Sequence, residues 1–304
     1  MTLKMINTLI KKTRRWHKKT GFPLLEAAAK YFERKKKEII FKAIDDLKVQ
    51  PETSNECLPE PSRIIWICWF QGLDNAPELV KRCIESVQLH SPDAKVVILT
   101  DENIPDYLSL PEHINSKYSS GLISKAQYSD IVRCSLLYQY GGIWMDSTVF
   151  LTKAIPESFY EKSFSSLRFD NNNGNALSQG FWTAYFIASQ KGNPLIKLVR
   201  DILYSYWKHH NVLIEYFLID YSFLYARERY ASYQQIMSEQ PITGNARFLI
   251  RQYMNHVLDT TAIQVLSSDP IGIYKLSHKE KYRESENGQP TAYSKILQGI
   301  FEIH

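Results

Sequence analysis

Two short segments near the middle of the chain combine carboxylates with a guanidinium group. Asp130 and Arg133 are three residues apart, which places both side chains on one face of a predicted helix. Asp146 follows a double-glycine turn, and Thr148 lies two residues later on the same face of a predicted strand. Carboxylates on rigid elements can bind ribose hydroxyls or a hard cation, and a guanidinium can bind phosphate. The pattern indicates a sugar-nucleotide site, although Asp130 and Arg133 alone would equally fit a structural ion pair.

Length and composition are those of an ordinary globular enzyme. The chain has 304 residues, of which 44% are hydrophobic and 23% are charged, enough for one large domain or two small ones. The four cysteines have no CxxC spacing, so we expect buried, reduced thiols in a cytosolic protein. The sequence has no run of 18 apolar residues and no secretory signal, so we expect no transmembrane helix.

The basic charge of the chain is concentrated at its N-terminus. Residues 1–48 carry a net charge of +9, whereas the remaining residues carry −4. The spacing of apolar and basic residues predicts an amphipathic helix over 2–19 and a second helix over 24–48. This basic helical extension fits either an anionic membrane surface or a solvated hairpin that packs on the following domain. Nucleic acid is not an expected partner, because no recognised binding motif accompanies the charge.

The main domain is predicted to be α/β. Residues 49–62 form the expected linker, and residues 63–304 form the expected catalytic domain. Two apolar runs, 63–70 and 95–100, predict parallel strands buried on both faces, and the amphipathic segment between them predicts a βαβ unit. Ligands bind beyond the carboxyl ends of such strands. Those ends present four candidate binding residues: Trp69, Gln71, Gly72 and Asp101.

The later elements are predicted with the same patterns. We expect helices over 122–140, from about 193, over 210–237 and over 243–256, and strands over 142–151, 180–188 and 262–266. Asp220 interrupts an apolar helical run, so it either makes a hydrogen bond in helix packing or serves as an active-site carboxylate.

Three segments in this order resemble a known family. They are Ile64-Ile65-Trp66-Ile67-Cys68-Trp69-Phe70-Gln71-Gly72, Ser129-Asp130-Ile131-Val132-Arg133 and Tyr140-Gly141-Gly142-Ile143-Trp144-Met145-Asp146. Together they look like a bacterial family of capsular polysaccharide synthesis proteins, which belongs with the DXD-containing glycosyltransferases related to initiating yeast mannosyltransferases. The similarity covers roughly residues 60–280 and leaves the N-terminal 50 residues outside.

The resemblance implies a GT-A fold, with a Rossmann-like mixed sheet flanked by helices, and a nucleotide-sugar donor with Mn²⁺ or Mg²⁺ at its diphosphate. It places Trp69 near the base, Asp130 near ribose or sugar hydroxyls, and Arg133 near phosphate or the donor sugar. Asp146 would be the first acid of the DXD motif. The second acid is replaced by Thr148, which we expect to supply a weaker oxygen ligand to the metal or a hydrogen bond.

That replacement leaves two alternatives open for the metal. Either Asp146 holds the cation together with the C-terminal residues Ser277 and His278, or metal dependence is weak. The resemblance also makes Asp220 a candidate contact to acceptor or donor sugar, and Gln179, Gly180 and Trp182 candidates for the pocket border.

The expected function is transfer of a sugar, from a UDP-sugar by analogy, to a surface polysaccharide or its lipid-linked precursor. The resemblance implies retention of the anomeric configuration. The leaving diphosphate would deprotonate the acceptor on the same face, or a covalent route would run through Asp220 or Glu215. The basic extension fits work at the inner face of the cell membrane. Two alternatives stay open: a degenerate protein that binds nucleotide or glycan without turnover, and a sugar-phosphate transferase, which no glycine-rich phosphate loop supports.

Overall fold

The central feature of the fold is a five-stranded mixed sheet in the order β2-β1-β3-β6-β5. The computed structural model describes residues 2–52, 62–172, 174 and 176–301. The strands are β1 (Ile64–Cys68), β2 (Lys95–Leu99), β3 (Gly142–Asp146), β5 (Phe164–Ser166) and β6 (Phe186–Ser189). The first three are parallel, β6 is antiparallel to β3, and β5 is antiparallel to β6. The predicted α/β class with a mixed, helix-flanked sheet is confirmed.

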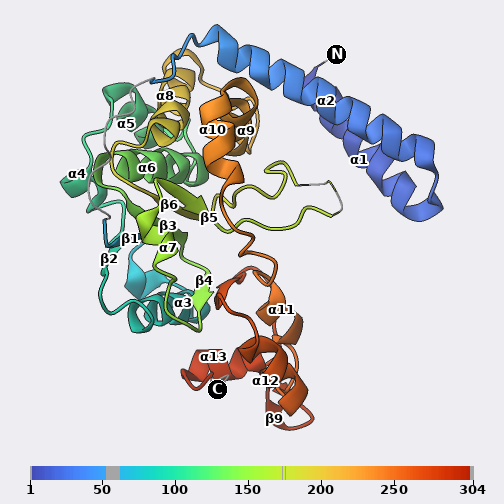
Figure 1. Cartoon of the computed structure of the whole chain (residues 1–304), viewed down its shortest axis with the longest axis vertical. Helices are drawn as coiled ribbons and strands as arrows, with labels where there is room; N and C mark the ends of the chain where they lie inside the picture. The colour runs from blue at the N-terminus through green and yellow to red at the C-terminus, as the bar shows by residue number, and fades with distance from the viewer. Residues whose placement is uncertain (1, 53–61, 173, 175, 302–304) are drawn as a thin grey trace.

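Helices cover both faces of this sheet (Figure 1). One face packs against α6 (Lys125–Tyr140), α8 (Pro194–His209) and α9 (Leu218–Arg229), and the other packs against α3 (Glu78–Leu89). Side chains alternate along the strands, so Trp66 and Trp144 enter the first core while Ile65 and Met145 enter the second. The predicted βαβ unit is confirmed as β1–α3–β2.

The C-terminal region forms a third core beside α3. Its elements are α11 (Leu249–Tyr253), α12 (Thr260–Ser267), β7 (Ile273–Lys275), β8 (Ser285–Glu286), β9 (Gln289–Pro290) and α13 (Ala292–Gln298). It joins the body where β7 pairs antiparallel with β4 (Val149–Leu151). The strand predicted over 262–266 is wrong, because these residues lie within α12. The Asp259 carboxylate caps that helix by accepting from the Ala262 N–H at 2.7 Å.

Other boundaries differ from the sequence prediction as well. The strand expected over 142–151 divides at a turn into β3 and β4, which belong to different sheets. The helix expected over 210–237 begins at Leu218 and divides at Tyr230 into α9 and α10 (Ala231–Ser238). The predicted 243–256 helix is reduced to α11, and the 180–188 strand to β6. The remaining short helices are η1 (Leu73–Asn75), α4 (Ile104–Tyr107), α5 (Glu112–Ser119) and α7 (Ser158–Glu161).

The N-terminal extension is a helical hairpin of α1 (Leu3–Thr20) and α2 (Pro23–Asp46), and it projects to one side of the body (Figure 1). Gly21 makes the turn in the left-handed conformation at φ 67°. The C-terminal half of α2 belongs to the body, since Ile40, Phe41 and Ile44 lie in its main core. Ion pairs also join α2 to the region of α9: Lys36 to Glu215 at 2.7 Å, Lys37 to Glu228 at 2.8 Å and Asp45 to Arg229 at 2.9 Å.

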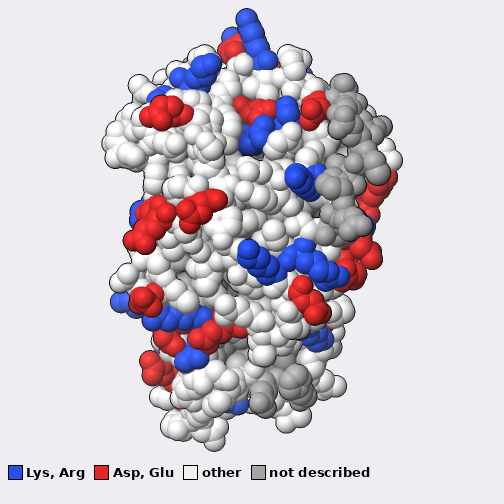
Figure 2. All heavy atoms as spheres, turned by 90° about the vertical axis from the view of Figure 1, so that its left-hand side faces the viewer, with Lys and Arg blue, Asp and Glu red and all other residues white. Residues whose placement is uncertain are grey.

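Charge is distributed unevenly over the molecule. On the side of the protein shown in Figure 2, acidic and basic side chains are interspersed among wide neutral areas.

Most of the predicted linker, residues 53–61, lies outside the described residues, as does Cys57. Cys68, Cys83 and Cys134 are free thiols; Cys83 and Cys134 are buried, whereas Cys68 is half-buried. Within the described residues, none of the helices combines the length and apolar character needed to cross a membrane.

Candidate active site

A cavity of about 580 Å³ opens where the carboxyl ends of β1 and β3 meet. These ends lie side by side, because Cys68 of β1 is paired with Asp146 of β3 in the sheet register. The cavity brings together most of the residues selected from the sequence: Trp69, Gln71, Asp130, Arg133, Asp146, Thr148, Asp220, Ser277 and His278. Its volume lies in the range of small-molecule sites, which is about 300–1,000 Å³.

The double glycine places Asp146 at this edge. Gly142 has a φ of 95°, and a Cβ at this position would lie 2.3 Å from the carbonyl oxygen of Ile64. The backbone of β3 can therefore approach β1 closely only if this residue has no side chain. Trp66 adds to the junction by donating from Nε1 to the carbonyl oxygen of Gly141 at 3.0 Å. Asp146 then emerges at the end of a rigid, fully paired strand.

Arg133 links the two predicted carboxylates. Its guanidinium contacts Asp130 at 3.2 Å and Asp146 at 3.4 Å, and lies 4.9 Å from the centre of the Trp144 ring. The ion pair expected from the sequence is thus present, and it also lines the cavity. The pKa of Asp130 is raised to about 7. Burial is the largest cause, the nearby Asp220 and Asp146 carboxylates add to the rise, and Arg133 opposes it.

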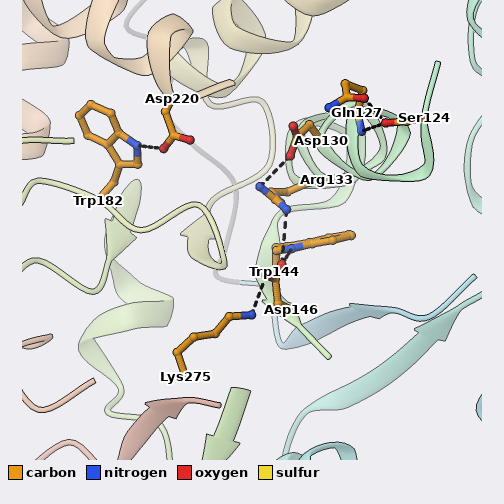
Figure 3. A network of polar contacts seen from close by, with 9 residues as sticks. All are labelled: Ser124, Gln127, Asp130, Arg133, Trp144, Asp146, Trp182, Asp220 and Lys275. Atoms are coloured by element: carbon orange, nitrogen blue, oxygen red, sulfur yellow. Dashed lines mark hydrogen bonds and ion pairs between the residues drawn. The ribbon is translucent and has the colours of Figure 1, made fainter. Parts of the chain in front are cut away.

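Lys275 is a cavity residue that the sequence analysis did not select. Its Nζ donates to Asp146 Oδ2 at 2.8 Å and to Thr148 Oγ1 at 2.7 Å, while Arg133 reaches the other oxygen of Asp146 (Figure 3). Burial alone would raise the pKa of Asp146, but Lys275 and Arg133 outweigh it and lower the pKa to about 2. A basic residue in the apolar strand just before Ser277 is the signal that could have identified Lys275.

Asp220 makes the packing hydrogen bond considered for it and also lines the cavity. It lies in the first turn of α9, accepts a hydrogen bond from the buried Trp182 Nε1 at 2.9 Å, and lines the cavity. Burial raises its pKa, and the Trp182 hydrogen bond opposes that rise. Glu215, the other carboxylate considered for a covalent route, is paired with Lys36 of α2 and does not line the cavity.

The segment after β7 closes one wall of the cavity. Ser277 and His278 both line it, and the His278 ring meets the Trp69 ring edge-on at 5.4 Å. Burial lowers the pKa of His278, as do Lys279 and Lys275, so the neutral imidazole is favoured. Trp69 Nε1 and Arg133 Nε are buried nitrogen atoms without a hydrogen-bond partner among the described residues.

Besides Glu215, five residues selected from the sequence lie outside the cavity lining: Gly72, Asp101, Gln179, Gly180 and Trp182, which reaches the site only through its hydrogen bond to Asp220. Gly72 is in the turn that follows Trp69, and Asp101 is held by Tyr118 Oη at 2.5 Å and Lys125 at 3.2 Å. Gln179 accepts from Arg227 at 2.9 Å. At Gly180, a Cβ would lie 2.1 Å from the Phe169 carbonyl oxygen, which explains the glycine by close backbone approach. Besides Lys275, the cavity is lined by residues not selected before: Phe70, Lys125, Trp144, Tyr185, Tyr216 and Phe217.

The donor set does not fit a divalent cation well. Mg²⁺ is bound by oxygen ligands, usually one or two carboxylates together with substrate phosphates and waters, so the carboxylate must be available to the ion. Within the described residues, no group of three or more His, Cys, Asp or Glu could hold a metal ion. Asp146 and Thr148, which carry the motif, are both bonded to the ammonium group of Lys275. We therefore assign no chemical step to a bound metal.

The chain is similar to one protein family and to two relatives named as glycosyltransferases. A family model described as capsular polysaccharide synthesis protein matches residues 16–296, so the match includes α2, which was expected to lie outside it. The chain is 30% identical over 162 residues to O-glycosyltransferase braB of Annulohypoxylon truncatum, covering 47% of this chain and 37% of the relative. It is 29% identical over 165 residues to glycosyltransferase afumC of Aspergillus fumigatus, covering 48% and 41%.

The matches to these two curated relatives span about two fifths of the relatives' length. Among solved structures, PaToxG glycosyltransferase aligns over 90% of this chain and 94% of its own, with a TM-score of 0.40 and 16% identity.

Proposed function

Because the chain belongs to the capsular polysaccharide synthesis protein family, we propose that it is a glycosyltransferase that uses a nucleotide-diphosphate sugar. The observation that carries this proposal is the cavity at the ends of β1 and β3. It combines an aromatic face at Trp69, carboxylates for hydroxyl groups at Asp130 and Asp220, and cations for a diphosphate at Arg133 and Lys275. The names of the two curated relatives support the same reaction class. The architecture proposed with it is GT-A.

The proposed donor is a UDP-sugar, and the proposed acceptor is a surface polysaccharide or its lipid-linked precursor. In the reaction, the bond between the anomeric carbon and the diphosphate oxygen breaks, and a bond forms to an acceptor hydroxyl oxygen. The hydroxyl proton passes to the leaving diphosphate on the same face, which retains the configuration. Arg133 stabilises the negative charge that develops on the leaving group, and electrostatic stabilisation of this kind is commonly the largest catalytic term. Asp220, oriented by Trp182, positions a sugar hydroxyl.

Ligand binding provides the test of this function. We expect UDP or a UDP-sugar to raise the melting temperature of the protein, and Asp146→Asn to weaken this effect by disturbing both cations. Asp101→Asn is the matched control, since Asp101 follows β2, two strands away from β3, and lies outside the cavity lining. Mass spectrometry of the products then measures whether the sugar has been transferred from the donor to the acceptor. A protein that binds no UDP, GDP, CMP or sugar conjugate refutes the proposal.

The same experiments separate the alternatives. Donor binding with neither hydrolysis nor transfer would indicate a degenerate nucleotide-binding protein. A phosphate retained in the product would indicate a sugar-phosphate transferase. Either result contradicts the proposed reaction while leaving the cavity as a nucleotide site.

We also propose that the hairpin tip binds an anionic membrane surface at the inner face of the cell membrane. Trp16, Phe22 and Leu24 are 62%, 56% and 69% exposed around the turn. Lys18 and Lys19 are exposed beside them. Apolar side chains enter the headgroup region, and each nearby cation adds about 1 kcal/mol on anionic lipid.

Vesicle sedimentation tests the membrane proposal. The protein should bind vesicles that contain phosphatidylserine, and bind pure phosphatidylcholine much more weakly. The triple variant Trp16→Ser, Phe22→Ser, Leu24→Ser should lose this binding and keep its melting temperature. Deletion of residues 1–48 is an unsuitable test, because it removes Ile40, Phe41 and Ile44 from the main core. Equal binding of wild type and triple variant would contradict the proposal.

A further inference from the structure

The position of Lys275 suggests how the site works despite the altered acidic motif. Its ammonium group lies between Asp146 and Thr148, at 2.8 and 2.7 Å. These two residues occupy the first and third positions of the Asp-Ser-Thr sequence, where the resemblance implied ligands to a divalent cation. A positive charge therefore already occupies the space between them, and it is supplied by the chain itself.

The fold holds this ammonium group firmly. Lys275 is the last residue of β7, and it is paired with Val149 of β4 in the register of the two-stranded sheet. The next N–H, from Leu276, donates to the Thr148 carbonyl oxygen at 2.8 Å. The Tyr185 ring lies 5.2 Å from Nζ. A side chain fixed from three directions is preorganised, so little reorganisation is needed when a ligand binds.

Lys275 also keeps capacity for a ligand. An ammonium group has three N–H donors, and two of them are used by Asp146 and Thr148. The side chain lines the cavity, as does Arg133. Together Lys275 and Arg133 carry two positive charges around the one carboxylate that they share (Figure 3). Two cations at one cavity, with one Lys275 N–H not used by Asp146 or Thr148, match the charge and hydrogen-bonding needs of a diphosphate.

We propose that the Lys275 ammonium group, held by Asp146 and Thr148 and assisted by Arg133, binds the diphosphate of the donor and stabilises it as the leaving group without a divalent cation. This inference rests on the proposed glycosyltransferase function. Asp146 and Thr148 then serve as positioning residues, because they orient Lys275 rather than contact a metal. The role of Lys275 also accounts for Thr148 at the position of the second acid. A second carboxylate there would bind Lys275 more tightly and neutralise its charge.

The experiment measures the binding of UDP and of inorganic pyrophosphate by calorimetry, in EDTA and in Mn²⁺. Wild type should bind UDP in EDTA within about threefold of its affinity in Mn²⁺. Lys275→Met, which keeps the length of the side chain, should weaken binding of both ligands about 10- to 100-fold, the loss of one charged hydrogen bond. Lys275→Arg should recover part of this loss. Lys281→Met, an exposed lysine six residues later, is the matched control.

The outcomes separate this inference from the proposed function. UDP binding that EDTA abolishes and Mn²⁺ restores overturns the inference, and so does unchanged binding by a Lys275→Met variant with a wild-type melting temperature. Donor turnover that requires Mn²⁺ would leave the glycosyltransferase proposal intact. Conversely, Lys275-dependent pyrophosphate binding in EDTA, with no binding or turnover of any nucleotide sugar, would support the cation role and refute the proposed function.

Discussion

Replacing Asp130 by asparagine should flatten the dependence of stability on pH. Asp130 is 17% exposed, and its pKa is raised from 3.8 to about 7 in the folded protein. The folded state therefore binds a proton more tightly than the unfolded state does. The resulting stabilisation is complete below pH 3.8 and is lost as the pH rises through 7. The difference between the two pKa values corresponds to about 4 kcal/mol in all.

The magnitude over an accessible pH range can be worked out from the same values. Between about pH 5 and pH 8.5, Asp130 should account for a loss of about 2 to 3 kcal/mol in the free energy of unfolding of the wild type. The amide side chain of the Asp130→Asn variant cannot ionise, so the variant lacks this contribution. Urea denaturation at both pH values, at constant ionic strength, measures the change in each protein. The difference between the two changes isolates Asp130, because other titrating groups contribute to both.

A control variant separates the buried group from a simple change in net charge. Asp106→Asn removes an exposed carboxylate and should leave the pH dependence close to that of the wild type. If Asp130→Asn and wild type lose the same stability over this pH range, burial does not raise the Asp130 pKa. The assignment of a proton to this carboxyl near neutral pH would then be refuted.

Two further substitutions test the packing that positions the cavity. Gly142→Ala should destabilise the protein by about 3 kcal/mol or more, because the new Cβ meets the Ile64 carbonyl oxygen. Gly21→Ala, also at positive φ but in open space, should cost only about 1 kcal/mol, and equal costs in urea denaturation would contradict the close-approach argument. Lys36→Met should cost about 3–5 kcal/mol by leaving the buried Glu215 unpaired. The double variant Lys36→Met, Glu215→Gln should recover part of that stability, and no recovery would show that the ion pair is not the cause.

The sequence was sufficient for features that depend on neighbouring residues. The apolar runs that became β1 and β2 predicted parallel strands, and the carboxyl end of β1 lies at the cavity, whereas the end of β2 lies outside its lining. Asp130 and Arg133 were found together because helical spacing alone makes them neighbours. The false strand at 262–266 arose because a short apolar run fits either structure, and the Asp259 cap was the local signal that decides for a helix.

Features that depend on distant residues could not be predicted in this way. The contact between Lys275 and Asp146 joins positions 129 residues apart, and it depends on the pairing of β4 with β7. Neither strand has an alternating pattern long enough to fix its partner, since each has three residues. Packing of the N-terminal hairpin on the following domain was one of the two alternatives left by the sequence, but its contacts were not predictable, because Lys36 gives no sign that it will pair with Glu215.

The attachment of α2 to the body limits how far the hairpin tip extends from the cavity. Helix α2 is joined to the body from Lys36 onward, and the 13 residues from Pro23 to Lys35 precede that attachment. At about 1.5 Å per residue, this free portion is about 20 Å long. If the tip rests in lipid headgroups, the free portion acts as a rigid spacer, and its length limits how near the cavity comes to the bilayer. The enzyme would then select acceptors by how far their reactive hydroxyl extends from the membrane, independently of any contact within the cavity.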